Sequence, residues 1–362
     1  MTLPNNPSQL SFSQIEGEFG QNPRRSLGKY RIKEPNVGDL GTLGLDNDGT
    51  GGNLSPIIPI DGQIAFSDFH GKSLNVVVNY WSGANEKRPQ PGYQRYQANN
   101  VHVVGGFRSR PNHGNGAKVY IHVNKSITND KGDSAADQAK CALITGGRWQ
   151  NVAQLRVDVG GSGRITGGGG EGGRGGGPAG DDHGEDGKRG SSALGIGYNC
   201  DVHVKSGGII AGGGGGGGGG GSCRQSDWHR RRAGGGGGGG GAGIDAGEGG
   251  AGGGKGPRNQ NADERRSYAR GGNGEAGNAN NGGTGDSGGN NRNEAIGGRG
   301  GNGGDLGQFG EDGQRGNGQR GERGSGGRGG HPGDSIRKRS GKSYNLYNNG
   351  TVKGPTSTGG LT

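Results

Sequence analysis

Short stretches of alternating apolar and polar residues recur along the chain, and a turn follows each of them. Residues 155–170 read LRVDVGGSGRITGGGG, and residues 200–214 read CDVHVKSGGIIAGGG. Weaker copies occupy residues 119–129 and 343–354. Alternation with β-branched residues is typical of a strand, and Lys-Ser-Gly or Asn-Asn-Gly is typical of a tight turn. We therefore predict that these copies form β-hairpins.

Further apolar stretches lie upstream of the two stronger copies. They contain Leu74, Val76, Val77, Val78 and Tyr80, and then Val101, Val103 and Val104. We predict a small β-domain over residues 73–159, to which residues 334–362 return as a C-terminal strand segment. Asp158 and Asp201 are expected at equivalent repeat positions, which favours a structural role over a catalytic acid pair.

The N-terminal region contains another repeat. Residues 9–15 read QLSFSQI, and residues 63–69 read QIAFSDF. Each copy is expected to open a short helix, with Ser13 or Ser67 as the N-cap. Turns rich in proline and glycine separate the copies, and core residues are few. We therefore interpret residues 1–72 as a module that docks on another protein.

Glycine dominates the chain from about residue 160 onward. There are 98 glycines in 362 residues, and only 24% of the chain is hydrophobic, whereas glycine usually makes up about 7% of a protein. Residues 212–221 and 234–241 are glycine at every position. Glycine falls at every third position from 298 to 316, and in a shifted register from 318 to 333. This region is either a flexible tract or a fold held by backbone hydrogen bonds.

A three-residue glycine period is typical of the polyproline-II helix, which has three residues per turn and makes no internal hydrogen bonds. Its N–H and C=O groups point sideways and need neighbouring backbones as partners. A helix surrounded on all sides needs glycine on all three faces, whereas an outer helix can carry side chains. We therefore predict a mostly β and irregular fold. In it, a small β-domain carries a bundle of glycine-rich polyproline-II helices, a polyglycine sandwich, over residues 160–333.

Charge and cysteine content argue against several classes of protein, among them nucleic-acid-binding and disulfide-stabilised proteins. The net charge is +10, but residues 160–333 carry 20 Lys and Arg against 18 Asp and Glu. The excess lies in the flanks, which does not favour a nucleic-acid-binding tract. The three cysteines have no metal-ligand spacing and fit free thiols made in a reducing cytoplasm. The N-terminus shows no signal-peptide pattern, and no apolar stretch is long enough to span a membrane.

Motifs of other glycine-rich classes fit less well. Gly-x-Gly-x-x-Gly arises by chance at this glycine density, without the strand–helix unit of a dinucleotide site. Arg-Gly-Gly recurs, but acidic residues balance its arginines and aromatic residues are few. Pro332 is the only proline in residues 298–333, which argues against collagen, and an ice-binding face of Thr or Ala is missing. The sequence contains no catalytic constellation, cofactor motif or metal motif, so we expect neither an enzyme nor a cofactor.

Polar loops interrupt the glycine and supply the candidate binding residues. Trp228 lies beside His229 and three arginines, and an indole flanked by guanidinium groups is typical of a contact surface. The alternative is that the loops are soluble turns with one stray aromatic residue. The candidates are Asp181, Asp182, His183, Arg224, Trp228, His229, Arg230, Arg231, Arg232, Arg265, Tyr268 and Asn291.

The order strand, turn, Ile and polyglycine, repeated with polar loops between, resembles the glycine-rich adhesins at the tail-fibre tips of T-even-like phages. The Phe-Ser-Gln-Ile and Phe-Ser-Asp-Phe boxes resemble the N-termini of marine phage structural proteins. The resemblance covers residues 1–72 and 155–333, whereas residues 74–155 have no counterpart in it. It implies an N-terminal fibre-attachment region followed by a polyglycine sandwich.

This resemblance implies a phage receptor-binding adhesin of the virion tail or fibre tip, made in the host cytoplasm. Residues 1–72 would join another tail or fibre protein, and the loops would bind an outer-membrane protein or a glycan of the bacterial surface. A homo-oligomer is compatible with it, whereas nucleic-acid binding and membrane insertion are not expected. Two alternatives stay open. One is a structural virion protein, a fibre or head decoration, without receptor contact, and the other is an RGG-type nucleic-acid-binding protein.

Overall fold

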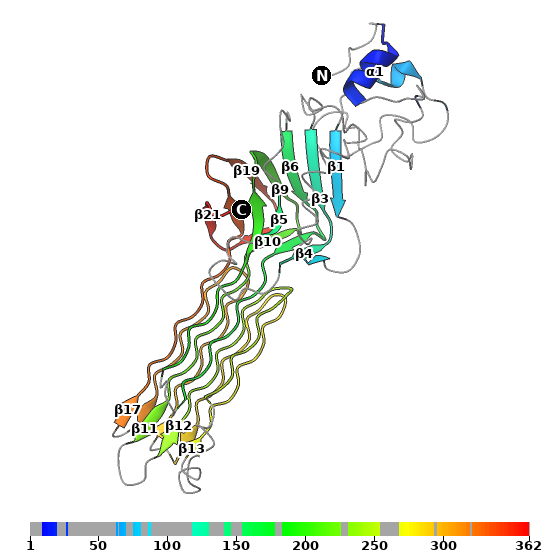
Figure 1. The fold of residues 1–362 in the computed structure, drawn as a ribbon. Helices are drawn as coiled ribbons and strands as arrows, with labels where there is room; N and C mark the ends of the chain where they lie inside the picture. The colour runs from blue at the N-terminus through cyan, green and yellow to red at the C-terminus, as the bar shows by residue number, and fades with distance from the viewer. Residues whose placement is uncertain are drawn as a thin grey trace.

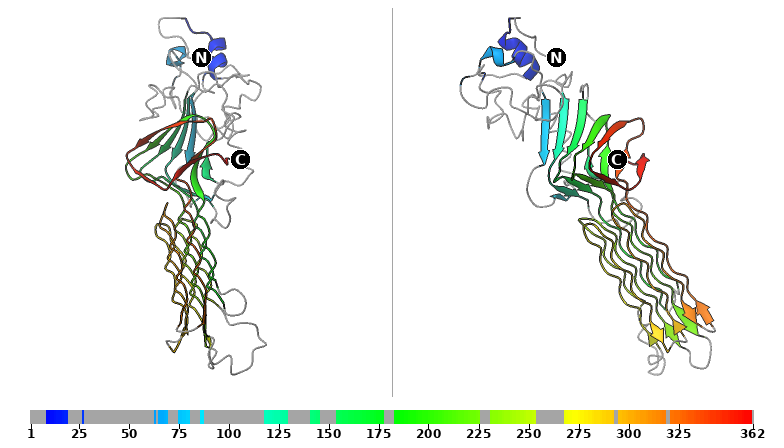
Figure 2. Two further views of the ribbon diagram at one scale, coloured as in Figure 1. Left: turned by 90° about the vertical axis from the view of Figure 1, so that its left-hand side faces the viewer. Right: turned by 180° about the vertical axis from the view of Figure 1, so that it is seen from behind.

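The computed structural model of the chain is elongated and mostly β (Figure 1). A body of β-strands lies between an N-terminal helix and a long set of extended segments that run side by side (Figures 1 and 2). The structure describes residues 9–19, 27, 63, 65–69, 75–80, 86–87, 118–129, 141–145, 154–177, 183–225, 231–253, 268–292, 295–318 and 321–361.

Three sheets of parallel strands form the body. The first contains β1 (Asn75–Tyr80), β3 (Lys118–Val123), β6 (Gln154–Val159), β9 (Cys200–Val204) and β19 (Tyr344–Asn348). The second contains β2 (Glu86–Lys87), β4 (Ser126–Thr128), β7 (Arg164–Thr166), β10 (Ile209–Ala211) and β20 (Thr351–Lys353). The third contains β5 (Cys141–Ile144), β8 (Ser192–Ile196), β18 (Ile336–Lys338) and β21 (Thr356–Thr358). Because the chain visits the three sheets in turn, the body is a three-sided parallel β-helix.

The predicted hairpins are wrong, although the strands and turns of the four copies are present. Each copy contributes to one coil of the β-helix. Val157 pairs with Val202 of the next coil, and Ile165 pairs with Ile210, both in parallel. The turn after β9 is closed by the Gly208 N–H, which donates to the carbonyl of residue 205 at 2.8 Å, but it only turns a corner. The alternation of apolar and polar residues determines which face of a strand is buried, but it does not determine which strand pairs with it. Because the repeats have the same apolar pattern, successive copies can stack on one another as coils.

The register also corrects the expected equivalence of Asp158 and Asp201. Asp201 lies opposite Arg156, two residues before Asp158. Asp158 is buried and forms an ion pair with Arg156, whose Nη2 lies 2.7 Å from a carboxylate oxygen. Asp201 accepts hydrogen bonds from Gln154 at 2.8 Å and from Asn345 at 2.9 Å. Asp201 therefore connects three successive coils, which is a structural role.

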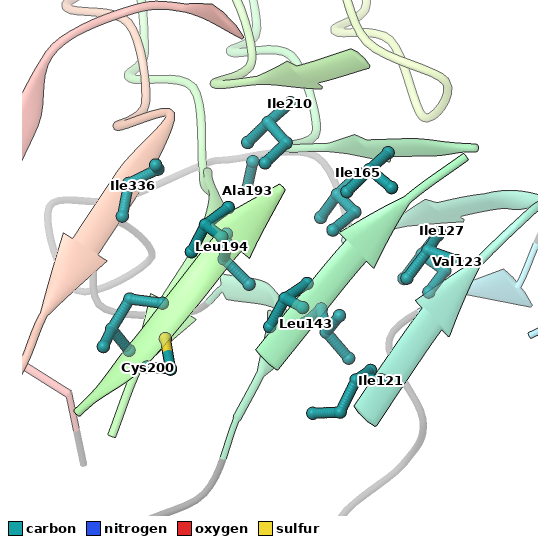
Figure 3. Close-up of a cluster of buried hydrophobic side chains, with 14 of the residues drawn as sticks. Ile121, Val123, Ile127, Leu143, Ile165, Ala193, Leu194, Cys200, Ile210 and Ile336 are labelled. Atoms are coloured by element: carbon teal, nitrogen blue, oxygen red, sulfur yellow. The ribbon is translucent and has the colours of Figure 1, made fainter. Parts of the chain in front are cut away.

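Apolar side chains fill the interior of the β-helix (Figure 3). Equivalent residues of successive coils form rows of fully buried side chains. One row of the second sheet consists of Ile127, Ile165 and Ile210. A row of the third sheet consists of Leu143, Leu194 and Ile336. Burial of each such side chain stabilises the fold by about 1.5–3 kcal/mol, and a shift of one residue would turn a row outward.

The first N-terminal copy forms the helix α1 (Phe12–Phe19), but its N-cap is Ser11 and not the predicted Ser13. The Ser11 hydroxyl accepts a hydrogen bond from the Gln14 N–H at 3.2 Å, and the Gln14 side chain accepts one from the Ser11 N–H at 2.7 Å. These two reciprocal hydrogen bonds form a capping box. The helix therefore begins two residues earlier than the sequence predicted.

The second copy forms the 3-10 helix η2 (Phe66–Phe69), so Ser67 lies inside a helix and is not its N-cap. The rings of Phe12 and Phe66 meet edge to face, with centroids 6.2 Å apart. This geometry is favourable for aromatic pairs. The two copies of the repeat therefore contact each other, and Ile15 of the first copy is buried.

Two insertions leave the β-helix at the same corner, between its second and third sheets. Residues 167–191 join β7 to β8, and residues 212–335 join β10 to β18. Strands β8 to β10 thus lie between the insertions and pair within the β-helix. The β-helix and the glycine-rich part interleave along the chain, so no single boundary at residue 160 separates them. The upstream residues Val101, Val103 and Val104 lie outside the described residues.

The insertions form ten extended segments, which we call the glycine bundle (Figures 1 and 2). They comprise residues 167–177, 183–191, 212–222, 234–243, 247–253, 271–278, 282–289, 297–305, 308–316 and 324–333. Hydrogen bonds between the backbones of different segments join them. The N–H groups of Gly216, Gly217 and Gly218 donate to three different neighbours at 2.8–2.9 Å, and their carbonyl groups accept from three others at 2.7–2.8 Å. The segment 212–222 therefore has six neighbours.

The segment 234–243 is surrounded in the same way and is also almost entirely glycine. The other eight segments enclose these two and carry side chains on their free faces. In the segment 308–316, Phe309 and Glu311 are exposed, while Gly310 and Gly313 donate to the neighbouring segment 324–333. Glycine therefore occupies the sides of each segment that face another backbone.

The glycine positions of the central segments leave no room for a side chain. A Cβ on Gly216 would lie 1.9 Å from the carbonyl oxygen of Glu171. We expect Gly216→Ala to destabilise the protein by at least about 3 kcal/mol, because separating the backbones breaks several hydrogen bonds of about 0.5–1.5 kcal/mol each. Denaturant unfolding measures this loss.

Gly177→Ala is the matched control, because a Cβ on Gly177 meets nothing within 4 Å. The free energy of unfolding of this variant should differ from that of the wild type by less than about 1 kcal/mol. Equal stability of the two alanine variants would show that close backbone contact does not hold the bundle.

The outer surface of the first sheet contains a stacked pair of rings that includes a histidine. His203 stacks on Tyr347 with ring centroids 4.3 Å apart. Desolvation lowers the pKa of His203 below its usual 6.5, and the nearby charges of Arg156 and Lys205 act in the same direction, against Asp158 and Asp201. A lowered pKa means that the unfolded chain binds the proton more tightly. His203 therefore contributes stability above pH 6.5, and this contribution is lost as the pH falls.

Acidification from pH 7.5 to 5 should consequently lower the melting temperature of the wild type more than that of His203→Gln. Glutamine keeps a polar planar group in the stack but does not titrate. Melting curves at both pH values measure the difference, and an equal shift in the two proteins would assign the pH dependence to other groups.

Candidate binding surface

The far end of the glycine bundle carries short strands and the residues that connect the segments there. Successive segments run in opposite directions, so every second connection falls at this end. In Figures 1 and 2 the strands β11, β12, β13 and β17 lie together at this end, away from the β-helix. Along the chain, residues 178–182, 226–230, 254–267, 293–294 and 319–320 join the segments that end there, and they lie outside the described residues. We call the end of the bundle that carries strands β11 to β17 the tip.

Two small sheets form the tip. One contains β13 (Tyr268–Ala269), β12 (Arg232–Ala233), β11 (Cys223–Gln225) and β17 (Gly321–Arg323). The other contains β14 (Asn290–Asn291), β15 (Ala295–Ile296) and β16 (Asn317–Gly318). Cys223, Ala233 and Ala295 are buried together, and their small side chains let the strands continue the close spacing of the bundle.

The tip brings four of the candidate residues together. Arg224 lies opposite Arg232 in the pair β11–β12, and Arg232 lies opposite Tyr268 in the pair β12–β13. The side-chain amide of Asn291 donates to the Arg232 carbonyl at 3.5 Å. Arg224 is exposed, and its Nη1 lies 3.9 Å from the carboxylate of the exposed Glu322. An exposed pair at this distance contributes little, so the Arg224 guanidinium is accessible to a ligand.

Two other candidates have structural contacts. Arg231 is only 9% exposed, so it packs within the tip. The His183 Nδ1 accepts a hydrogen bond from the Ser325 backbone N–H at 3.0 Å and lies 2.8 Å from the Ser325 hydroxyl. An accepting Nδ1 requires that the ring proton be on Nε2. His183 therefore links the start of segment 183–191 to segment 324–333.

The remaining six candidates lie outside the described residues, and their role stays a prediction. They are Asp181, Asp182, Trp228, His229, Arg230 and Arg265.

Sequence reasoning missed two arginines of the tip. Arg292 follows β14, is exposed and has a φ of 54°, which is uncommon for a residue with a side chain. Arg323 lies in β17 and donates to the Gly318 carbonyl. The break in the glycine triplets between Gly316 and Gly318 was the signal for β16 and β17. Arg292 lies in the polar stretch 290–294 that interrupts the glycine, but nothing within that stretch distinguished it.

The reactive groups of the described residues are buried or dispersed. Cys141, Cys200 and Cys223 are buried free thiols, and desolvation, together with the charge of Asp201, raises the pKa of Cys200 to about 12. Such a thiol stays protonated and unreactive. In the described ranges, no group of three or more His, Cys, Asp or Glu side chains is placed to hold a metal ion. No helix in these ranges is long and apolar enough to cross a membrane.

Backbone-bonded segments that end in a tip rich in arginine and amide groups form an elongated scaffold, and its end is the candidate contact surface. The chain belongs to the family of the phage tail fibre adhesin Gp38, which matches residues 95–357. The predicted resemblance to tail-fibre-tip adhesins is therefore confirmed, and the protein is a phage tail fibre adhesin that acts in host attachment. The match also includes residues 95–154, for which no counterpart was predicted.

A crystal structure of the gp37-gp38 adhesin tip complex of the bacteriophage S16 long tail fiber is similar to this chain. It is 19% identical, with a TM-score of 0.39, and the similarity covers 83% of this chain and 91% of that chain. No curated protein matches the chain.

Proposed function

We propose that this adhesin joins another tail or fibre protein through residues 1–72 and binds a receptor on the bacterial surface through its tip. One observation carries the proposal. The strands of the tip gather at one end of the molecule, and α1 lies at the opposite end (Figure 1). A receptor bound at the tip and a fibre bound near α1 would therefore not compete for space.

The glycine segments act, in this proposal, as polyproline-II helices that make the bundle stiff. Three successive N–H groups of segment 212–222 donate to three different neighbours, as three residues per turn require. The ten glycines of residues 212–221 would span about 31 Å at about 3.1 Å per residue. Lateral bonds hold nearly every residue of the central segments, so the tip would lose little conformational freedom when it binds.

The tip offers the chemistry that recognition needs. Arginine and aromatic side chains contribute most of the binding energy at interfaces, and the exposed Arg224 can bind a phosphate or carboxylate group in a bidentate manner. Residues at the tip can also vary without placing a side chain between the central backbones, which suits a surface that adapts to different hosts. The receptor would be an outer-membrane protein or a glycan.

Attachment would use the N-terminal module. The contact between Phe12 and Phe66 ties its two copies together, and Phe66 is still 40% exposed. An exposed aromatic side chain next to a helix is suited to a partner surface. Synthesis in the host cytoplasm would keep the buried thiols reduced.

The receptor role predicts that Trp228→Ala combined with Arg224→Ala reduces adsorption of the protein to host cells by about tenfold or more. Loss of two interface anchors of about 1–2 kcal/mol each has this effect. The melting temperature should stay within a few degrees, because Arg224 is exposed and its ion pair is long. Binding of labelled protein to host cells, measured by flow cytometry, tests the prediction.

Arg328→Ala is the control, because Arg328 is exposed on the side of the bundle, outside the tip. Unchanged adsorption of the double variant would exclude residues 224–232 and make residues 258–268 the next candidates. If variants of both stretches adsorb normally, the chain is a structural virion protein without receptor contact.

The attachment role predicts that removal of the N-terminal module abolishes assembly with the fibre but not binding to host cells. A chain without residues 1–72 should still bind host cells but should not assemble with the fibre, as measured by co-purification with virions. Its melting temperature must be compared with that of the full chain, because Ile15 is buried. A fragment that fails to fold would make the N-terminal module a part of the core.

A further inference from the structure

The tip has a strong excess of positive charge. Among the described residues of the bundle and tip, eight arginines and one acidic residue, Glu322, lie in a tip strand or within three residues of one. The arginines are Arg224, Arg231, Arg232, Arg270, Arg292, Arg299, Arg315 and Arg323. All of them except Arg231 and Arg232 are exposed, so most of this charge faces solvent.

The rest of the bundle, with its turns near the β-helix, has the opposite balance, and we call it the shaft. Its described residues include ten acidic and four basic side chains. The acidic residues are Glu171, Glu185, Asp186, Asp245, Glu248, Glu275, Asp286, Asp305, Glu311 and Asp312, and the basic residues are Arg174, Lys188, Arg189 and Arg328. The sequence shows only a near balance over residues 160–333, because a count along the chain averages the two ends. The back-and-forth course of the segments sorts the charges in space.

We propose that the positive tip binds a polyanionic polymer carrying phosphate or carboxylate groups on the cell surface, and that the negative shaft forces the adhesin to approach this polymer end-on. The inference rests on the proposed receptor role of the tip and specifies the chemistry of its first contact. It also assigns a function to the shaft, whose side chains take no part in the hydrogen bonds between the central backbones.

The range of electrostatic forces supports this geometry. At physiological salt a charge is screened within about 8 Å, which is much shorter than the span of about 31 Å for ten residues of the bundle. In an end-on approach, the arginines in and beside the tip strands lie nearest to the polymer, whereas Arg299 lies further back, level with Asp286. In a side-on approach the acidic shaft residues enter the same range and are repelled. Steering of this kind raises association rates by about 10–1000-fold at low salt.

Three exposed arginines on different parts of the tip are suited to the contact. Arg224 lies in β11, Arg323 lies in the adjacent β17, and Arg292 follows β14. Guanidinium groups stay charged at all physiological pH values and bind phosphate and carboxylate in a bidentate manner. Binding should therefore depend strongly on salt.

The test compares two triple variants of the full chain that lose the same charge. The tip variant combines Arg224→Gln, Arg292→Gln and Arg323→Gln. The shaft variant combines Arg174→Gln, Lys188→Gln and Arg328→Gln, all at exposed positions. Association rates are measured by surface plasmon resonance on polyphosphate, on polygalacturonate and on neutral dextran, at 0.05 M and 0.5 M salt.

We expect the tip variant to associate at least about tenfold more slowly than the wild type on a polyanionic surface at 0.05 M salt, and equally at 0.5 M salt. The shaft variant should keep the wild-type rate or fall by less than about twofold. A preference for polyphosphate or for polygalacturonate identifies the anionic group. Equal slowing of both variants would show that net charge and not its separation controls association, and wild-type rates for both would overturn the proposal.

Adsorption to host cells separates this inference from the receptor role. If the wild type associates with polyanions no faster than with neutral dextran but still adsorbs to host cells, and the double variant Trp228→Ala, Arg224→Ala loses this adsorption, the receptor role stands and the electrostatic step is wrong. If wild-type protein does not adsorb to host cells at all, the receptor role fails first. Melting curves of both variants confirm that the fold is intact, as expected for exposed substitutions.

Discussion

The glycine bundle depends on one constraint: backbones that bond laterally lie too close together to admit a Cβ. At Gly216 the distance to the nearest carbonyl oxygen would be 1.9 Å. The N–H and C=O groups of the central segments bond to neighbouring segments. Ordering glycine is entropically unfavourable, and lateral bonds at nearly every residue offset this cost. Because of the same constraint, large side chains of the bundle fit only on its outer faces and at the tip. These surfaces are therefore the ones available for binding.

The β-helix and the bundle are continuous through their hydrogen bonds. The Gly167 N–H donates to Ala211, and the Gly212 N–H donates to Lys353, so the ladder of the second sheet extends into the first residues of both insertions. Rows of Ile and Leu fix the register of the coils, and this register sets the positions from which the glycine segments start. Side-chain packing in one part therefore determines backbone packing in the other.

The sequence predicted the features that depend on local spacing. The strands around Val157 and Val202, the turn at Gly208 and the backbone-bonded glycine all follow from periodicity. Periodicity did not predict which strands pair with one another, because a strand in a parallel coil and a strand in a hairpin show the same alternation of apolar and polar residues. The tip illustrates the same limit. Arg224, Arg232 and Asn291 lie together at the tip, and their role in binding stays a prediction. The burial of Arg231 and the positive φ of Arg292 depend on which strands meet, and this is decided by contacts between distant segments.

Both insertions start and end at one corner of the β-helix, and this has an evolutionary consequence. A chain that leaves a corner and returns to it must cross the bundle an even number of times, so the bundle can grow only by pairs of segments. Each added pair brings one more connection to the tip and changes no coil of the β-helix. Duplication of two adjacent glycine-rich segments would therefore widen the tip in a single genetic step and leave the coils of the β-helix unchanged.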